Sequence, residues 1–147
     1  MKETKVSLSD LYEYDVVDGS LFYEDVLDDV FGAEDWTEDD AFGNAVGFVD
    51  HMAVRASING NKITFSSFSD KDEDDAQVLF GLGKSVLRAV EFCVARVFHN
   101  YEEPSEDSLS TLDDEDVQYF EDECGMVVAI HLNYEENEVI ASFYMRM

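Results

Sequence analysis

The densest group of potential metal ligands in the sequence is Asp70-Lys-Asp-Glu-Asp-Asp75. Its first five residues match the Asp-x-Asp-x-Asp opening of a calcium-binding EF-hand loop. Such a loop also requires glycine at its sixth position and glutamate at its twelfth, because the chain turns sharply at one and the other ligates the ion through both oxygens. Asp75 and Gly81 occupy these positions. We therefore expect weak binding of divalent ions at most, and no dedicated metal site.

A second short motif, Gly83-Lys84-Ser85, is similar to the end of a phosphate-binding P-loop. The full motif needs another glycine five residues before Gly83, where this chain has Val78, and a strand before the loop. Neither condition is met, so no nucleotide site is predicted.

The remaining residues that could do chemistry are three histidines and two cysteines. His51, His99 and His131 lie in or beside apolar segments without the spacing of a metal or catalytic pair. Cys93 and Cys124 are too few for a zinc site or a disulfide framework. We expect no catalytic residue, metal or cofactor, and interpret the protein as a non-enzyme.

Two hairpins are the elements most strongly indicated by the sequence. Residues 51–68 alternate around Asn59-Gly60-Asn61, and Asn-Gly is a strong signal for a tight hairpin turn. Residues 117–145 contain a second hairpin, preceded by one further short strand. Together they predict an antiparallel sheet of four to five strands.

Helices are predicted between and before these hairpins. Apolar residues recur at three- and four-residue spacing over residues 76–99, on a face wide enough to indicate a long buried helix. Ser20 can cap a helix that ends at Gly32, and Thr37 a second short acidic helix. Trp36 is interpreted as a core anchor or an interface anchor, with the core favoured. The predicted fold is α+β, a single domain over residues 1–147.

The charge of the chain is extreme. Asp and Glu number 35 against 9 Lys and Arg, for a formal net charge of −26, while 46% of residues are hydrophobic. A disordered acidic tail lacks that apolar content, and a surface so negative repels nucleic acid and anionic lipid. No secretory leader or membrane span is seen, so we expect a cytoplasmic protein of a bacterial cell, encoded by the cell or by a phage, with a basic protein as its partner.

The acids are concentrated in blocks. Residues 1–50 carry 15 acids against 2 bases, and residues 102–124 carry 11 acids and no base, whereas residues 51–69 contain no acid. Carboxylates one helical turn apart are about 5–6 Å apart at Cβ, which is comparable to the charge repeat of a phosphate backbone. We predict that two acidic blocks bind the partner: Glu24, Asp25, Asp28, Asp29, Glu34, Asp35, Asp39 and Asp40, and Glu102, Glu103, Glu106, Asp107, Asp113, Asp114, Glu115, Asp116, Glu121 and Asp122.

With its size, charge and carboxylate blocks, the chain resembles the DNA-mimic inhibitors that phages and mobile elements use against restriction and CRISPR nucleases. The resemblance implies that its carboxylates fill the basic groove of a nuclease or another protein that binds DNA or RNA. One alternative is an immunity protein or antitoxin that neutralises a basic toxin. Another is a small ligand-binding or enzymatic α+β domain whose acidity is incidental. A homodimer is compatible with each of these.

Overall fold

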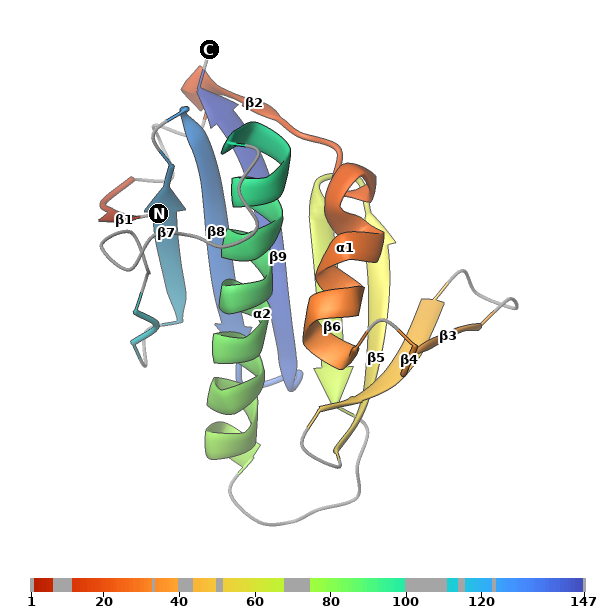
Figure 1. Ribbon diagram of the computed structural model, residues 1–147. Coiled ribbons are helices and arrows are strands. Elements are labelled where there is room, and N and C mark those ends of the chain that lie inside the picture. The colour runs from red at the N-terminus through yellow and green to blue at the C-terminus, as the bar shows by residue number, and fades with distance from the viewer. Residues whose placement is uncertain are drawn as a thin grey trace.

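The structure is a computed structural model that describes residues 2–6, 12–32, 34–39, 44–49, 52–67, 75–99, 111–113, 116–122 and 124–146. These residues form two layers, a nine-stranded sheet and a pair of helices that cover one of its faces (Figure 1). Every strand pairing is antiparallel. The predicted α+β class is confirmed.

The sheet has the order β1-β7-β8-β9-β6-β5-β4-β3, and β2 pairs with the end of β9. The two helices are α1 (Ser20–Phe31) and α2 (Asp75–His99). The strands are β1 (Lys2–Thr4), β2 (Tyr14–Val16), β3 (Thr37–Asp39), β4 (Asn44–Val49), β5 (Met52–Asn59), β6 (Lys62–Ser67), β7 (Val117–Glu121), β8 (Met126–Asn133) and β9 (Glu138–Arg146).

The topology consists of two similar halves. In the first, α1 precedes the meander β4-β5-β6, with the short β3 between them; in the second, α2 precedes the meander β7-β8-β9. The last strands of the halves, β6 and β9, pair with each other, so the order is symmetric about that boundary. The helices lie side by side and run in opposite directions (Figure 1).

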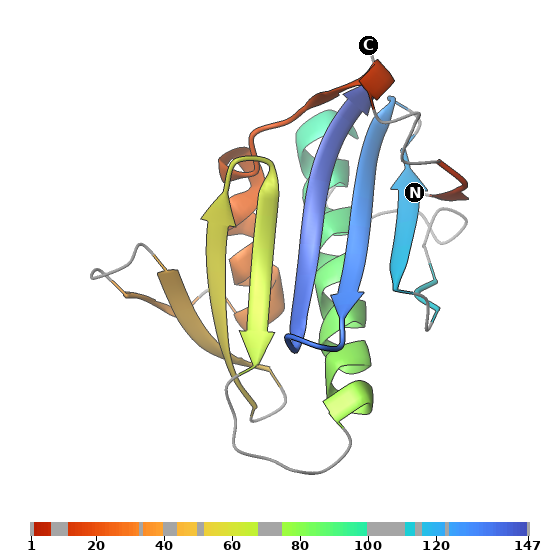
Figure 2. The ribbon, with the colours of Figure 1, turned by 180° about the vertical axis from the view of Figure 1, so that it is seen from behind.

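The core lies between the helices and the sheet. Alternate strand residues point toward the helices, as the pleat requires, and they include Phe65, Phe120, Ile130 and Phe143, all fully buried. Phe22 of α1 stacks on Phe143, with ring centroids 4.9 Å apart. No described element covers the opposite face of the sheet, which is seen in Figure 2.

Both predicted hairpins and the long helix are present. The hairpin predicted at 51–68 is β5 and β6, and Gly60 has the positive φ of +61° expected of the Asn-Gly turn. The strand and hairpin predicted at 117–145 are β7, β8 and β9, and the helix predicted at 76–99 is α2. The count of four to five strands was wrong because β1, β2, β3 and β4 were not predicted.

The second short helix predicted from Thr37 is also wrong. Thr37–Asp39 forms β3, whose residues pair with β4 from Val46 to Asn44. Thr37, Glu38 and Asp39 are residue types that suit the first turn of a helix. Here, however, they pair with the backbone groups at the edge of β4, and these strand hydrogen bonds determine the structure. Among the described residues, α1 is therefore the one acidic helix before the first hairpin.

The start and end of α1 follow from its flanking residues. The side chain of Asp18 accepts a 3.0 Å hydrogen bond from the backbone N–H of Ser20, and this bond lowers the pKa of Asp18. The N-cap residue is Gly19, and Ser20, predicted as the cap, is the first residue of the helix. At the other end Gly32, with φ of +102°, donates its N–H to the carbonyl of Asp28 at 2.9 Å, as a helix-ending glycine does.

Candidate partner-binding surface

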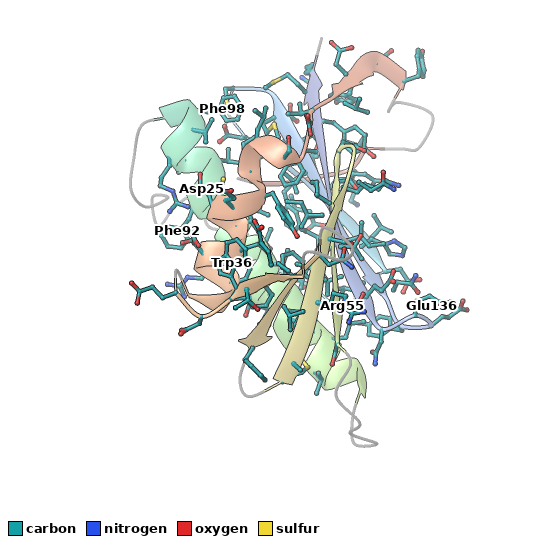
Figure 3. The ribbon with its side chains drawn as sticks, turned by 90° about the vertical axis from the view of Figure 1, so that its right-hand side faces the viewer. Asp25, Trp36, Arg55, Phe92, Phe98 and Glu136 are labelled. Atoms are coloured by element: carbon teal, nitrogen blue, oxygen red, sulfur yellow. The ribbon has the colours of Figure 1, made fainter. Side chains whose placement is uncertain are left out.

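The outer face of α1 is acidic because most of its apolar residues face inward. Phe22, Val26, Leu27 and Phe31 are buried against the sheet and α2. Four acids lie on the other side of the helix, Glu24, Asp25, Asp28 and Asp29, and they form two i,i+4 pairs. Figure 3 shows the two layers nearly edge-on, with Asp25 on the helix side.

Two of these four carboxylates are engaged within the protein. Asp28 accepts a 2.8 Å hydrogen bond from the indole Nε1 of Trp36, whose ring is half-buried against the core. Asp29 pairs with Arg96 of α2 at 2.6 Å, and both side chains are about one-third exposed. Trp36 therefore anchors the segment after α1 to that helix. Its ring also packs against the core, in agreement with the favoured interpretation of Trp36 as a core anchor.

Further acids continue this surface beyond the helix. Glu34 and Asp35 lie exposed in the turn that follows Gly32. Asp39 lies in β3, and its side chain and the whole of Asp40 are outside the described residues. We call the continuous part the α1 acidic surface: Glu24, Asp25, Asp28, Asp29, Glu34 and Asp35.

The outer face of the neighbouring helix α2 carries bases, while its two acids are Asp75, its first residue, and the buried Glu91. Lys84 and Arg88 lie exposed on the outer face of α2, and Arg96 lies one-third exposed at its border with α1. The Lys84 ammonium lies 4.6 Å from the ring centroid of Phe80, and the Arg88 guanidinium 5.5 Å from that of Phe92, both cation–π distances. These bases are four and eight residues apart in the sequence, which places them on one side of the helix. The prediction of a buried helix did not take this spacing into account.

The described part of the second acidic block lies elsewhere. Asp113, Asp116, Glu121 and Asp122 lie on or beside β7, near the edge of the sheet away from α1. The basic helix α2 lies between these acids and the α1 acidic surface (Figure 1). Glu102, Glu103, Glu106, Asp107, Asp114 and Glu115 are outside the described residues. The described parts of the two blocks therefore do not form one continuous face.

Local contacts also engage two of the acids near β7. Glu121 pairs with Arg146 of β9 at 3.3 Å. Asp122 accepts a 2.6 Å hydrogen bond from the Cys124 thiol. These contacts leave the α1 acidic surface as the larger described group of outward carboxylates.

Neither thiol has the properties of a nucleophile. Burial raises the pKa of Cys93 to about 12, and burial together with the hydrogen bond to Asp122 raises that of Cys124 to about 11. Both are thus protonated near neutral pH, whereas a reactive cysteine needs its thiolate. Among the described residues, no three His, Cys, Asp or Glu side chains are placed to hold a metal ion. The Asp70–Asp74 cluster, His51 and the side chain of His99 lie outside those residues.

No family model, curated protein or solved structure matches this chain. Within the described residues, neither helix is long and apolar enough to cross a membrane. The function is therefore inferred from the surface itself.

Proposed function

We propose that the protein is an inhibitor that binds the basic surface of a nucleic-acid-binding protein, such as a nuclease, and excludes its substrate. The observation that carries this proposal is the α1 acidic surface in a chain whose formal net charge is −26. Four of its six acids lie on α1, whose apolar face is buried against the core, so a partner meets them in the arrangement that the helix sets. A nuclease of a restriction or CRISPR system, or a nuclease toxin, is the class of partner that such a surface suits.

The physical basis is the exchange of counterions. A groove of lysine and arginine that binds nucleic acid gains affinity by releasing the counterions condensed on the phosphates, and its binding weakens steeply with salt. A fixed carboxylate array attracts the same groove and also steers the two proteins together. The outward Glu24 and Asp25, with no described base beside them in sequence, are best placed to make such contacts.

A local interface of the immunity-protein or antitoxin type is the second candidate. It is favoured by the separation of the two acidic blocks and by the apolar side chain of Leu21, which is 67% exposed at the start of α1. An extended mimic would use acids along the length of a groove, whereas a local inhibitor would combine α1 carboxylates with an apolar anchor. The two modes differ in which acidic residues contribute to the binding affinity.

The test begins with capture of partners from nuclease-treated lysate of the source cells on the immobilised protein, at low and high salt. The captured protein is then purified, and its binding to a labelled DNA or RNA duplex is measured while this protein is added. Competition at equimolar amounts, weakened by salt, is the expected result. A captured protein that keeps its nucleic acid, or binding that is indifferent to salt, would contradict the proposal.

Matched variants locate the interface. The triple variant Glu24→Gln, Asp25→Asn, Glu34→Gln should weaken binding at least tenfold, and it spares Asp28 and Asp29, which have internal partners. The control Asp116→Asn, Glu135→Gln, Glu136→Gln changes the charge equally at exposed sites away from α1. If the control weakens binding as strongly, the interface is extended, as in a mimic; if Leu21→Ser weakens binding and the control does not, it is local.

A further inference from the structure

The face of the sheet opposite the helices has a composition unlike the rest of the protein. Strand registers assign its residues, because paired residues of an antiparallel ladder project on the same side. On β4 to β9 the assigned acids are Glu121 and Glu138, against the bases Arg55, Lys62 and Arg146. In a chain of net charge −26, the described part of this face is close to neutral. We call it the open face.

Much of the open face is apolar. Its uncharged residues include Val46, Phe48, Val117, Tyr119, Val127, Ile140 and Tyr144. Phe48 is 61% exposed and Val117 is 37% exposed, at opposite ends of the face, and Val16 of β2, beside Tyr144, is 68% exposed. Such residues exceed what a solvated sheet face needs, since those faces are normally polar.

One end of the open face is closely packed. Val127, the second residue of β8, is fully buried, and its strand neighbours include Tyr144, directly opposite it on β9, and Glu121 on β7. Short residues border this region, with Ser142 beside Ala129 and Lys62, and Thr64 beside Ile140. A surface of this shape can pack closely against another sheet.

We infer that the open face binds a second copy of this chain, so that two sheets pack face to face in a symmetric dimer. Electrostatics favours this mode of self-association. Two copies that approach through α1 bring carboxylates together, whereas approach through the open faces brings together surfaces that are nearly neutral. The α1 acids lie beyond the sheet, roughly a helix diameter of 10 Å away, and the Debye length near physiological salt is about 8 Å. Figure 3 shows this separation, with Asp25 on one side and Arg55 on the other.

The area is sufficient for a stable dimer. Six strands spaced about 4.8 Å apart, with about 3.4 Å per residue, give a footprint of roughly 600–700 Å² for each copy. The two footprints together reach about 1,200–1,400 Å², within the lower part of the range of about 1,200–2,000 Å² for specific interfaces. Facing sheets in β-sandwiches pack about 10 Å apart, a distance that side chains of this size fill. The inference stands apart from the proposed function, because α1 faces away from the dimer interface.

The test is the molar mass in solution, measured by light scattering during size-exclusion chromatography at low and high salt. We expect twice the 16.7 kDa of one chain, with the dimer strengthened by salt because screening reduces the repulsion between copies. The mass of a single chain at every salt concentration would overturn the inference. So would binding of a single-stranded oligonucleotide to the open face of a monomer.

Three variants separate a local effect from net charge. Thr64→Asp places an acid near the centre of the open face and should give monomers. Lys84→Gln changes the charge by the same amount on α2, and this control should remain dimeric. Thr64→Lys reduces the net negative charge, yet it should also give monomers, because it places like charges at the buried centre of the interface. Circular dichroism confirms folding of each variant. If Thr64→Lys strengthens the dimer, the association depends on net charge and does not use this face.

Discussion

The packing of α1 on the sheet depends on Gly47 of β4, and replacing it with alanine should destabilise the protein. A Cβ placed on Gly47 would lie 2.5, 2.6 and 2.9 Å from three ring carbons of Phe31, the last residue of α1. Such contacts are shorter than van der Waals distances allow. Phe31 is buried and lies against Phe65, with ring centroids 6.0 Å apart, so the ring has little room to move.

The magnitude follows from two opposing terms. Overpacking a core position costs about 1–3 kcal/mol, while exchanging glycine for alanine within a strand returns about 0.5–1 kcal/mol of backbone entropy. The net loss in the free energy of unfolding should thus be about 0.5–2 kcal/mol. For a chain of this length, each kcal/mol lowers Tm by roughly 3 °C, so a decrease of about 2–6 °C is expected.

A double-mutant cycle tests the cause. Phe31→Leu alone should cost about 1–2 kcal/mol because it removes buried volume. Combined with Gly47→Ala it should cost less than the sum of the single changes by at least about 0.5 kcal/mol, since the smaller side chain makes room for the new methyl group. Urea unfolding followed by circular dichroism measures all four proteins. A Gly47→Ala variant as stable as the wild type, or strict additivity, would refute the reasoning.

Three further predictions concern a helix glycine, the thiols and salt. Gly81→Ala should raise the free energy of unfolding by up to about 1 kcal/mol in thermal or urea unfolding, because no neighbouring atom lies within 4 Å of its Cβ position and alanine favours helix. Gly83→Ala should stabilise the protein less, or destabilise it, because the new Cβ would lie 2.6 Å from Leu132. Iodoacetamide should label Cys124 slowly near neutral pH and faster as pH rises toward its pKa of about 11, while Asp122→Asn should lower that pKa and speed the labelling. Added salt should raise Tm, because it screens repulsion within a chain of net charge −26; a Tm that falls would contradict this.

The elements predicted from the sequence are those whose local signals agree with their surroundings. The Asn59-Gly60 turn and the alternation beside it specify β5 and β6, and the wide apolar face of α2 specifies a helix against the sheet. Glycine has a low helix propensity, yet α2 includes both Gly81 and Gly83. At Gly83 the reason is packing, because its lack of a side chain leaves space for Leu132 and Leu112.

The missed strands depend on partners distant in the chain. Both β1 and β2 are three residues long, and they exist because β7 and β9 offer free backbone groups beside them. The same reason makes Thr37–Asp39 a strand, although its acids suit a helix start. Sequence periodicity over three residues cannot distinguish these outcomes, because the deciding hydrogen bonds come from strands elsewhere in the chain.

The placement of the α1 acids on one helix face could be predicted from the sequence, but the charged residues that lie around them in the fold could not. The i,i+4 spacing of Glu24, Asp25, Asp28 and Asp29 places them on one helix face from sequence alone. That Arg96 pairs with Asp29, and that a basic helix lies beside α1, follows from the packing of two helices far apart in the chain. The separation of the two acidic blocks likewise depends on the strand order, which the sequence does not specify.

The distribution of charge connects the two proposals. Repulsion among so many carboxylates is smallest when they are spread over helix, turns and edges, which leaves the open face as the one described large surface near neutrality. A dimer through that face would present two α1 acidic surfaces on opposite sides, each directed away from the other. A partner with a single basic groove would then meet one copy at a time, and a partner with two such grooves would gain from bivalent contact. Thr64→Asp should therefore reduce affinity only for a partner that is itself dimeric, whereas the α1 triple variant should reduce it for any basic partner.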